Sequence, residues 1–276
     1  MRAELVADAH ARLGEGPLWD ARTSELLWVD ILPGIVHRFD PATGADRAFD
    51  AGSYVGAVVP RAQGGYALAV AAGFALATDD GDMTPLAAVG HDEAVRMNDG
   101  ACDSAGRFWA GSMRLDEAAG GGCLYRLDAD HRVAAICPGV SISNGIAWSP
   151  DDTLLYYVDT PTSAIDVFDF DSATGAATDR RVLTPVDGFP DGLVVDAEGF
   201  LWVAFWGAGQ VRRYSAQGDV AEVIEVPVAH TTKCAFGGPD LADLYITTAA
   251  GEEPHAGGLF VAQPGVVGMP AHAYAG

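Results

Sequence analysis

The segment FPDGLVVDAEGFLWVA (189–204) contains two short apolar runs separated by the turn DAEG, and a tryptophan lies at the centre of the second run. Turn residues between short apolar runs favour an antiparallel β-hairpin. Six related hairpins recur along the chain, each marked by a central strand triplet: Leu27-Trp28-Val29, Tyr66-Ala67-Leu68, Phe108-Trp109-Ala110, Leu155-Tyr156-Tyr157, Leu201-Trp202-Val203 and Leu244-Tyr245-Ile246. Successive triplets lie 39 to 47 residues apart.

A repeat of this length with about four strands per unit is typical of β-propeller blades. We find no stretch with helical periodicity over ten or more residues, which argues against an α-solenoid of similar period. We therefore predict an all-β fold, in which residues 1–276 form a single six-bladed β-propeller domain with four-stranded antiparallel blades around a central channel. Strands near Leu5-Val6 and Leu259-Phe260-Val261 are expected to close the ring. Two stacked β-sandwiches are the structural alternative.

The chain is strongly acidic, with 16 Lys and Arg against 38 Asp and Glu among 276 residues and a formal net charge of −22. So few cations cannot form the basic face that nucleic-acid binding needs, and the negative charge repels anionic lipid head groups. With 49% hydrophobic and 20% charged residues, the chain has enough apolar material for a core. The composition therefore predicts a folded protein with neither a nucleic-acid nor a membrane partner.

The cysteines show neither CxxC pairs nor zinc-site spacing: Cys102, Cys123, Cys137 and Cys234. Residues 1–10 have no apolar segment typical of a secretory signal, and no window approaches the ~20 apolar residues of a membrane span. We therefore expect reduced thiols in a cytoplasmic protein, which acts as a monomer or a weak dimer.

One position recurs at the same phase of each repeat, where the first strand of the hairpin begins. Aligned on the following turn, that position reads Glu15, Val55, Asn98, Asn144, Asp191 and Cys234. Because propeller blades are related by rotation, residues at one phase form a ring around the channel. Two carboxylates and two carboxamides converging there need a neutralising cation. Their oxygens suit Ca²⁺, Mg²⁺ or Mn²⁺. The thiol of Cys234 at the same phase leaves Zn²⁺ as an alternative cation.

At these positions the sequence resembles the gluconolactonase/regucalcin family, also called the senescence marker protein family. The resemblance runs along the whole chain and is carried by these segments: LGEGPLW (13–19), RMNDGACDSAGRFWAGSM (96–113), SISNGIAWSPD (141–151), FPDGLVVDAEGFLWVA (189–204), TTKCAFGGPDLADLYITTA (231–249), AGGLF (256–260) and AYAG (273–276). The joint pattern is far more specific than any single motif.

The resemblance implies a six-bladed propeller with one divalent cation (Ca²⁺, Zn²⁺, Mn²⁺, Mg²⁺ or Fe²⁺) at the channel mouth. It implies that Glu15, Asn144 and Asp191 bind the metal. It also implies that three residues contact the substrate: Arg96, Asn98 and Asp116. Asp99 competes with Asn98 for the position facing the metal, and the sequence leaves that choice open.

The residues themselves suggest roles that agree with the resemblance. Three protein oxygens leave positions on a cation for water and substrate, as a catalytic metal requires. The Asp191 carboxylate can accept a proton from the attacking water as a general base. Arg96, two residues before Asn98, should point the same way along a strand, where its guanidinium can bind sugar hydroxyls or a carboxylate. Trp206 follows a strand pattern that favours core packing.

These features predict a metal-dependent lactonase that hydrolyses a sugar-derived aldonolactone, of the gluconolactone or pentonolactone type, to the aldonic acid. Two alternatives remain open. The first is a calcium-binding regulatory or buffering protein. The second is a hydrolase of other esters or phosphotriesters at the same metal.

Overall fold

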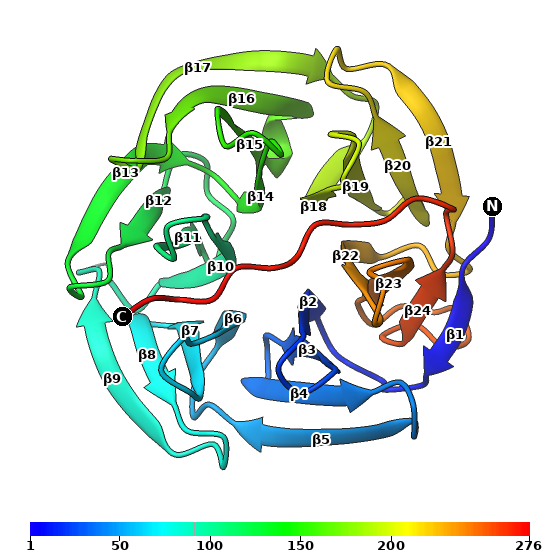
Figure 1. The fold of residues 1–276 in the computed structure, drawn as a ribbon, viewed down its shortest axis with the longest axis horizontal. Coiled ribbons are helices and arrows are strands. Elements are labelled where there is room, and N and C mark those ends of the chain that lie inside the picture. The colour runs from blue at the N-terminus through cyan, green and yellow to red at the C-terminus, as the bar shows by residue number, and fades with distance from the viewer. Residues whose placement is uncertain (91) are drawn as a thin grey trace.

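The computed structural model describes residues 1–90 and 92–276, which form six four-stranded antiparallel sheets arranged in a ring (Figure 1). The predicted six-bladed β-propeller is therefore confirmed. Five blades use four consecutive strands each, whereas the sixth takes its outermost strand from the N-terminus. That strand pairs with the strand at Leu259–Ala262, so the two ends of the chain close the ring as expected.

The strands of each blade are given in order from the channel outward. Blade one contains β2 (Gly14–Asp20), β3 (Glu25–Asp30), β4 (Ile35–Asp40) and β5 (Ala45–Asp50). Blade two contains β6 (Val55–Pro60), β7 (Tyr66–Val70), β8 (Gly73–Ala77) and β9 (Met83–Ala88). Blade three contains β10 (Val95–Cys102), β11 (Phe108–Arg114), β12 (Gly122–Leu127) and β13 (Val133–Val140). Blade four contains β14 (Ser143–Trp148), β15 (Leu154–Asp159), β16 (Ala164–Asp171) and β17 (Ala176–Pro185). Blade five contains β18 (Phe189–Val195), β19 (Leu201–Trp206), β20 (Gln210–Tyr214) and β21 (Val220–Glu225). Blade six contains β22 (Thr231–Gly237), β23 (Asp243–Thr248), β24 (Leu259–Ala262) and β1 (Glu4–Ala7). A short 3-10 helix, η1 (Thr160–Thr162), follows β15.

Burial falls steeply from the channel to the rim of the ring. All residues of β22 and all but one of β2 are buried, whereas five of the six residues of β5 are exposed. The apolar clusters lie between neighbouring blades. One of them packs Trp202 and Val211 of blade five against Phe236 and Ile246 of blade six. The strands closest to the axis are thus held on both sides, which suits them to carry a precisely oriented site.

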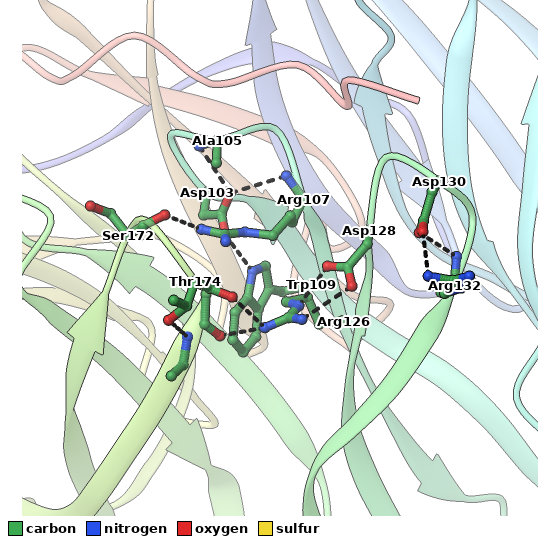
Figure 2. A network of polar contacts seen from close by, with 12 residues as sticks. Asp103, Ala105, Arg107, Trp109, Arg126, Asp128, Asp130, Arg132, Ser172 and Thr174 are labelled. Carbon is green, nitrogen blue, oxygen red and sulfur yellow. Dashed lines mark hydrogen bonds and ion pairs between the residues drawn. The ribbon is translucent and has the colours of Figure 1, made fainter.

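The aspartate of the turn after the innermost strand stabilises the repeating hairpin. In blade three, the Asp103 carboxylate accepts hydrogen bonds from Trp109 Nε1 (2.8 Å) and Arg107 Nε (2.6 Å) (Figure 2). Arg107 also donates to a backbone oxygen in the turn between β16 and β17 (2.6 Å), which ties blade three to blade four. Blade five repeats the contact between Asp196 and Trp202 (2.9 Å). These bonds explain the recurring spacing of turn aspartate and strand tryptophan.

The C-terminal segment after β24 crosses one end of the channel (Figure 1, red). Tyr274 is fully buried; its backbone N–H donates to Pro60 O (2.8 Å) and its hydroxyl to Asp128 O (2.9 Å). The segment also lines a cavity of about 130 Å³ in the channel. A site at the channel mouth must therefore open at the opposite end. None of the helices in the described ranges is long and apolar enough to cross a membrane.

Candidate functional site

Four blades direct polar side chains into a cavity of about 360 Å³ at one end of the channel. Glu15 on β2, Asn98 on β10, Asn144 on β14 and Asp191 on β18 all line it, and each is only 5–6% exposed. Arg96, on β10, lines the same cavity. The volume falls within the range of small-molecule sites. The structure thus brings together five of the six site residues expected from the sequence.

A β-bulge in the innermost strand lies at, or directly after, each of the four oxygen-bearing residues. Bulges commonly re-aim side chains beside active sites. Pairing with the next strand resumes only after two residues in three blades, and those unpaired residues are Asn98-Asp99, Asn144-Gly145 and Asp191-Gly192. In blade one, the register shift follows Glu15 directly. A Cβ on Gly145 would lie 2.8 Å from Asp191 O, so glycine lets two neighbouring bulges approach.

Blade six differs from the sequence alignment, which put Cys234 on the ring. Its register shift falls between Thr231 and Lys233, and regular pairing already includes Cys234. Cys234 is fully buried and lines the cavity under the C-terminal segment instead. The expectation was wrong because the bulge of blade six skips one residue rather than two. The Cys234 thiol therefore lies outside the ring of oxygen donors and gives no support to Zn²⁺ as the cation.

A chain of hydrogen bonds across three blades orients the two carboxamides. Arg96 Nη1 donates to Asn98 Oδ1 (2.6 Å), and Asn98 Nδ2 donates to Asn144 Oδ1 (2.9 Å). Asn144 Nδ2 donates to Thr160 Oγ1 (2.8 Å), whose hydroxyl donates to Pro190 O (2.7 Å). Asn144 therefore keeps its carbonyl oxygen on the side of Asn98, and an amide oxygen has a second lone pair for a cation.

The two carboxylates repel one another in the absence of a cation. Burial raises the pKa of Asp191, and the negative charges of Glu15 and Asp99 raise it further. Burial and the charge of Asp99 likewise raise the pKa of Glu15 to about 7. Lys233 and Arg96 oppose both shifts. The site therefore has a deficit of positive charge, which a divalent cation would supply.

The donor atoms fit a hard divalent cation. Asp191 Oδ1 is buried and has no hydrogen-bond partner within residues 1–90 and 92–276, which is unusual for a carboxylate oxygen. Across the described chain, no group of three or more His, Cys, Asp or Glu side chains is placed to hold a metal, so a metal site here needs an oxygen donor of another kind. The predicted set of Glu15, Asn144 and Asp191 includes an amide oxygen, a donor that Ca²⁺ accepts readily.

The structure distinguishes Asn98 from Asp99. Asn98 lines the cavity, whereas Asp99 forms an ion pair with Lys233 and accepts the backbone N–H of Gly100 (2.6 Å). Asp99 is still close enough to raise the pKa of both Glu15 and Asp191. Asp99 therefore lies beside the candidate metal site, turned toward Lys233.

Asp116 is the expected site residue that the structure does not bring into the cavity. Its side chain is 59% exposed, and Arg114 binds both carboxylate oxygens (2.8 and 3.0 Å). The Arg114 hydrogen bond lowers the pKa of Asp116 to about 2. The next residue, Glu117, has a φ of 56° in the turn after β11 and lines the cavity. The acidic side chain at this wall is therefore Glu117.

Two aromatic side chains form part of the cavity wall. Phe189 lines the cavity and is 55% exposed. Trp206 also lines it, and its ring stacks on His230 at 4.3 Å with an interplanar angle of 10°. Trp206 is thus a wall residue rather than the core residue that the strand pattern favoured.

Sequence reasoning missed three residues of this region. Thr160 lies in η1 and carries no motif that would single it out. Glu117 is adjacent to the expected Asp116, and the positive-φ turn that directs its side chain into the cavity has no signal in the sequence. Lys233 did have a signal, because it is the only lysine in the 276 residues.

Comparison with known proteins identifies the family of this chain. The family described as SMP-30/Gluconolactonase/LRE-like region matches residues 13–250. Regucalcin of Danio rerio is 36% identical over 296 residues, covering 100% of this chain and 99% of that protein. The candidate sugar lactone lactonase YvrE of Bacillus subtilis is 38% identical over 277 residues, covering 95% of each.

A solved structure is similar over nearly the same length. The calcium-binding protein regucalcin of Agrobacterium tumefaciens matches with a TM-score of 0.93 and 30% identity, covering 99% of this chain and 97% of that one. The family model spans most of the chain, and the similarity to regucalcin extends over its whole length. The chain therefore belongs to the SMP-30/gluconolactonase/LRE-like family.

Proposed function

We propose that this protein is a metal-dependent lactonase that opens a sugar-derived aldonolactone to the aldonic acid. The observation that carries the proposal is the unpartnered Asp191 oxygen beside Glu15 and Asn144 at the wall of a small-molecule cavity. Membership of a family that contains gluconolactonases supports the same reaction class. The similarity to a candidate sugar lactone lactonase supports a sugar lactone as substrate.

Ring opening needs a polarised carbonyl, an activated water and a proton for the departing ring oxygen. A divalent cation held by Glu15, Asn144 and Asp191 supplies Lewis-acid polarisation of the carbonyl when it is bound. Asp191 accepts a proton as the water oxygen attacks the carbonyl carbon. The carbon–ring-oxygen bond then breaks, and Asp191 returns the proton to the ring oxygen, which becomes a hydroxyl group.

Arg96 and Glu117 have the chemistry to bind the polar rim of a sugar. Arg96 is the one cation among the described residues that line the cavity. Its guanidinium can donate to the lactone oxygens and to the carboxylate that ring opening creates. The Glu117 carboxylate can accept hydrogen bonds from hydroxyl groups. Phe189 and Trp206 provide apolar surface for the carbon face of the ring.

An activity panel tests the proposal. Chelator-treated protein should be assayed with hexonolactones, pentonolactones, a simple aryl ester and a phosphotriester, with Ca²⁺, Mg²⁺, Mn²⁺ or Zn²⁺ restored in turn. We expect at least one sugar lactone to be hydrolysed with a kcat/KM at least about tenfold above that of the aryl ester and the phosphotriester, which corresponds to ~1.4 kcal/mol. Preference for a phosphotriester or a simple ester would contradict the sugar-lactone assignment.

Replacing Arg96 by alanine is expected to raise KM roughly 10- to 100-fold, because a hydrogen bond to a charged group contributes about 1.5–3 kcal/mol. Steady-state kinetics on the best lactone of the panel would measure it. Arg114→Ala is the matched control, since Arg114 binds Asp116 outside the cavity, and its KM should stay within about twofold of the native value. An unchanged KM in Arg96→Ala would remove Arg96 from the substrate site.

Cation binding without turnover is the second candidate function. It is favoured by the similarity to a solved structure that is named a calcium-binding protein. The cavity beyond the donor atoms and the buried Arg96 favour the lactonase, because a cation buffer needs neither. Tight Ca²⁺ binding with no turnover of any lactone in the panel would favour the second candidate.

A further inference from the structure

The only lysine of the chain lies buried in the central channel. The sequence has 16 Lys and Arg, and all except Lys233 are arginine. Lys233 is on β22, is 6% exposed, and pairs through Nζ with Asp99 on β10, which is 3% exposed. Lysine is rarely buried unless it is paired. Its placement in the channel therefore calls for a specific explanation.

The neighbouring strand leaves room for the lysine stem. A Cβ on Gly192 would lie only 2.3–2.7 Å from Lys233 Cβ, Cγ and Cδ. Gly192 directly follows the candidate metal ligand Asp191, so the lysine stem passes against the bulge that presents that ligand. Lys233 also lines the cavity under the C-terminal segment, together with Leu193. Lys233 thus reaches Asp99 from the closed side of the candidate metal site.

Asp99 would otherwise be a third carboxylate at the site. Its Oδ1 contacts Lys233 and the N–H of Gly100, whereas its buried Oδ2 has no partner among the described residues. Asp99 belongs to the same two-residue bulge as Asn98, and the equivalent bulges of blades four and five begin with Asn144 and Asp191. With the Asp99–Lys233 pair neutral as a unit, the candidate metal ligands carry two negative charges, those of Glu15 and Asp191, which match one divalent cation.

We propose that Lys233 is a positioning residue that holds Asp99 away from the metal and so sets the ligand charge of the site at minus two. The inference rests on the proposed function, because it assumes a divalent cation at Glu15, Asn144 and Asp191. Ligand charge count tunes cation affinity, and a third carboxylate would also reduce the electron-withdrawing power of the cation toward a carbonyl oxygen. Stability alone does not explain the pair, because a buried ion pair is often no more stable than an apolar replacement.

The test measures cation affinity without any substrate. Chelator-treated native protein and variants would be titrated with Ca²⁺ and Mn²⁺ by calorimetry. Lys233→Met releases Asp99 and should tighten binding at least about tenfold. Asp99→Asn leaves the ammonium to compete for Glu15 and Asp191, and should weaken binding at least about tenfold. The double variant removes both charges and should bind within about threefold of the native protein.

The opposite changes in cation affinity expected for the two single variants distinguish this positioning role from a structural one. Loss of a merely structural contact would weaken binding in both single variants or leave it unchanged in both, and either result overturns the proposal. Arg180→Met is the matched control, because it removes a cation from the Asp166 pair on the outer strands of blade four; its affinity should stay within about twofold. Circular dichroism would verify the fold of each variant.

Three further outcomes are also decisive. If Lys233→Met does not fold, Asp99→Asn decides the question, because asparagine still accepts the N–H of Gly100; unchanged affinity in that variant overturns the proposal. If the native protein binds neither cation, the proposed metal site fails together with this inference. If the native protein binds one cation and the variants lack the expected signs, only the role of Lys233 fails.

Discussion

Replacing Asp191 by asparagine is expected to lower kcat for lactone hydrolysis by about 10²- to 10⁴-fold, the range that a general base contributes. Asparagine has nearly the same size, and Asp191 Oδ1 has no hydrogen-bond partner among the described residues to lose. The substitution therefore removes the charge that takes the proton from water and leaves the packing intact. Steady-state kinetics at saturating divalent cation would measure the loss, and circular dichroism would verify the fold.

Asp187→Asn is the matched control for that prediction. Asp187 is exposed in the segment before β18. Its replacement by asparagine changes the net charge by the same amount as Asp191→Asn, but outside the cavity. We expect its kcat and KM to stay within about twofold of the native values. Retained turnover in Asp191→Asn would remove Asp191 as the base and would direct the search to Glu15 or Glu117.

Removing divalent cations with a chelator is expected to abolish turnover and to lower the melting temperature. At a free cation concentration 100-fold above its Kd, binding stabilises the folded state by about 2.7 kcal/mol. For a chain of this size, that corresponds to roughly 5 to 10 °C. Adding back the cation should restore both activity and stability. A chelated protein that hydrolyses the lactone as fast as the cation-loaded form would contradict metal dependence.

The stabilisation by the cation should grow with pH. The folded, cation-free protein holds the pKa of Glu15 at about 7 and raises that of Asp191, so it binds more protons than the unfolded chain. The protonated Glu15 and Asp191 therefore stabilise the cation-free folded state at low pH, and this stabilisation is lost as the pH rises from about 4 to 7. The cation binds the deprotonated forms. The difference in melting temperature between loaded and chelated protein should thus widen from pH 5 to pH 8.

The propeller itself could be predicted because its signals are local and repeat. Triplets such as Leu201-Trp202-Val203 recur at nearly constant spacing, and turns such as DAEG (196–199) separate them. The contact between Asp196 and Trp202 shows why that spacing recurs, since the turn residue binds the tryptophan of the next strand. Each hairpin has its own sequence pattern of two apolar runs and a turn, so the number of blades follows from counting the hairpins.

The site could be predicted only in part, because its geometry depends on bulges. Asn98, Asn144 and Asp191 are unpaired residues of their strands, and the alignment found all three. The same alignment misplaced Cys234, because the bulge of β22 skips one residue. Glu117 rather than Asp116 lines the cavity because a turn with positive φ decides the direction of each side chain.

The sequence by itself determined the all-β class, the six repeats and the excess of carboxylates over basic residues. Periodicity and charge are properties of the chain alone, so no knowledge of strand packing was needed. Only the tertiary structure decided that Asp99 pairs with Lys233, although the two residues are 134 positions apart. That pairing depends on two blades facing each other across the channel and on the space that Gly192 leaves for the lysine. The formal charge of −22 is a sum over the whole chain, whereas the proposed cation site depends on how a few buried charges are arranged in the channel.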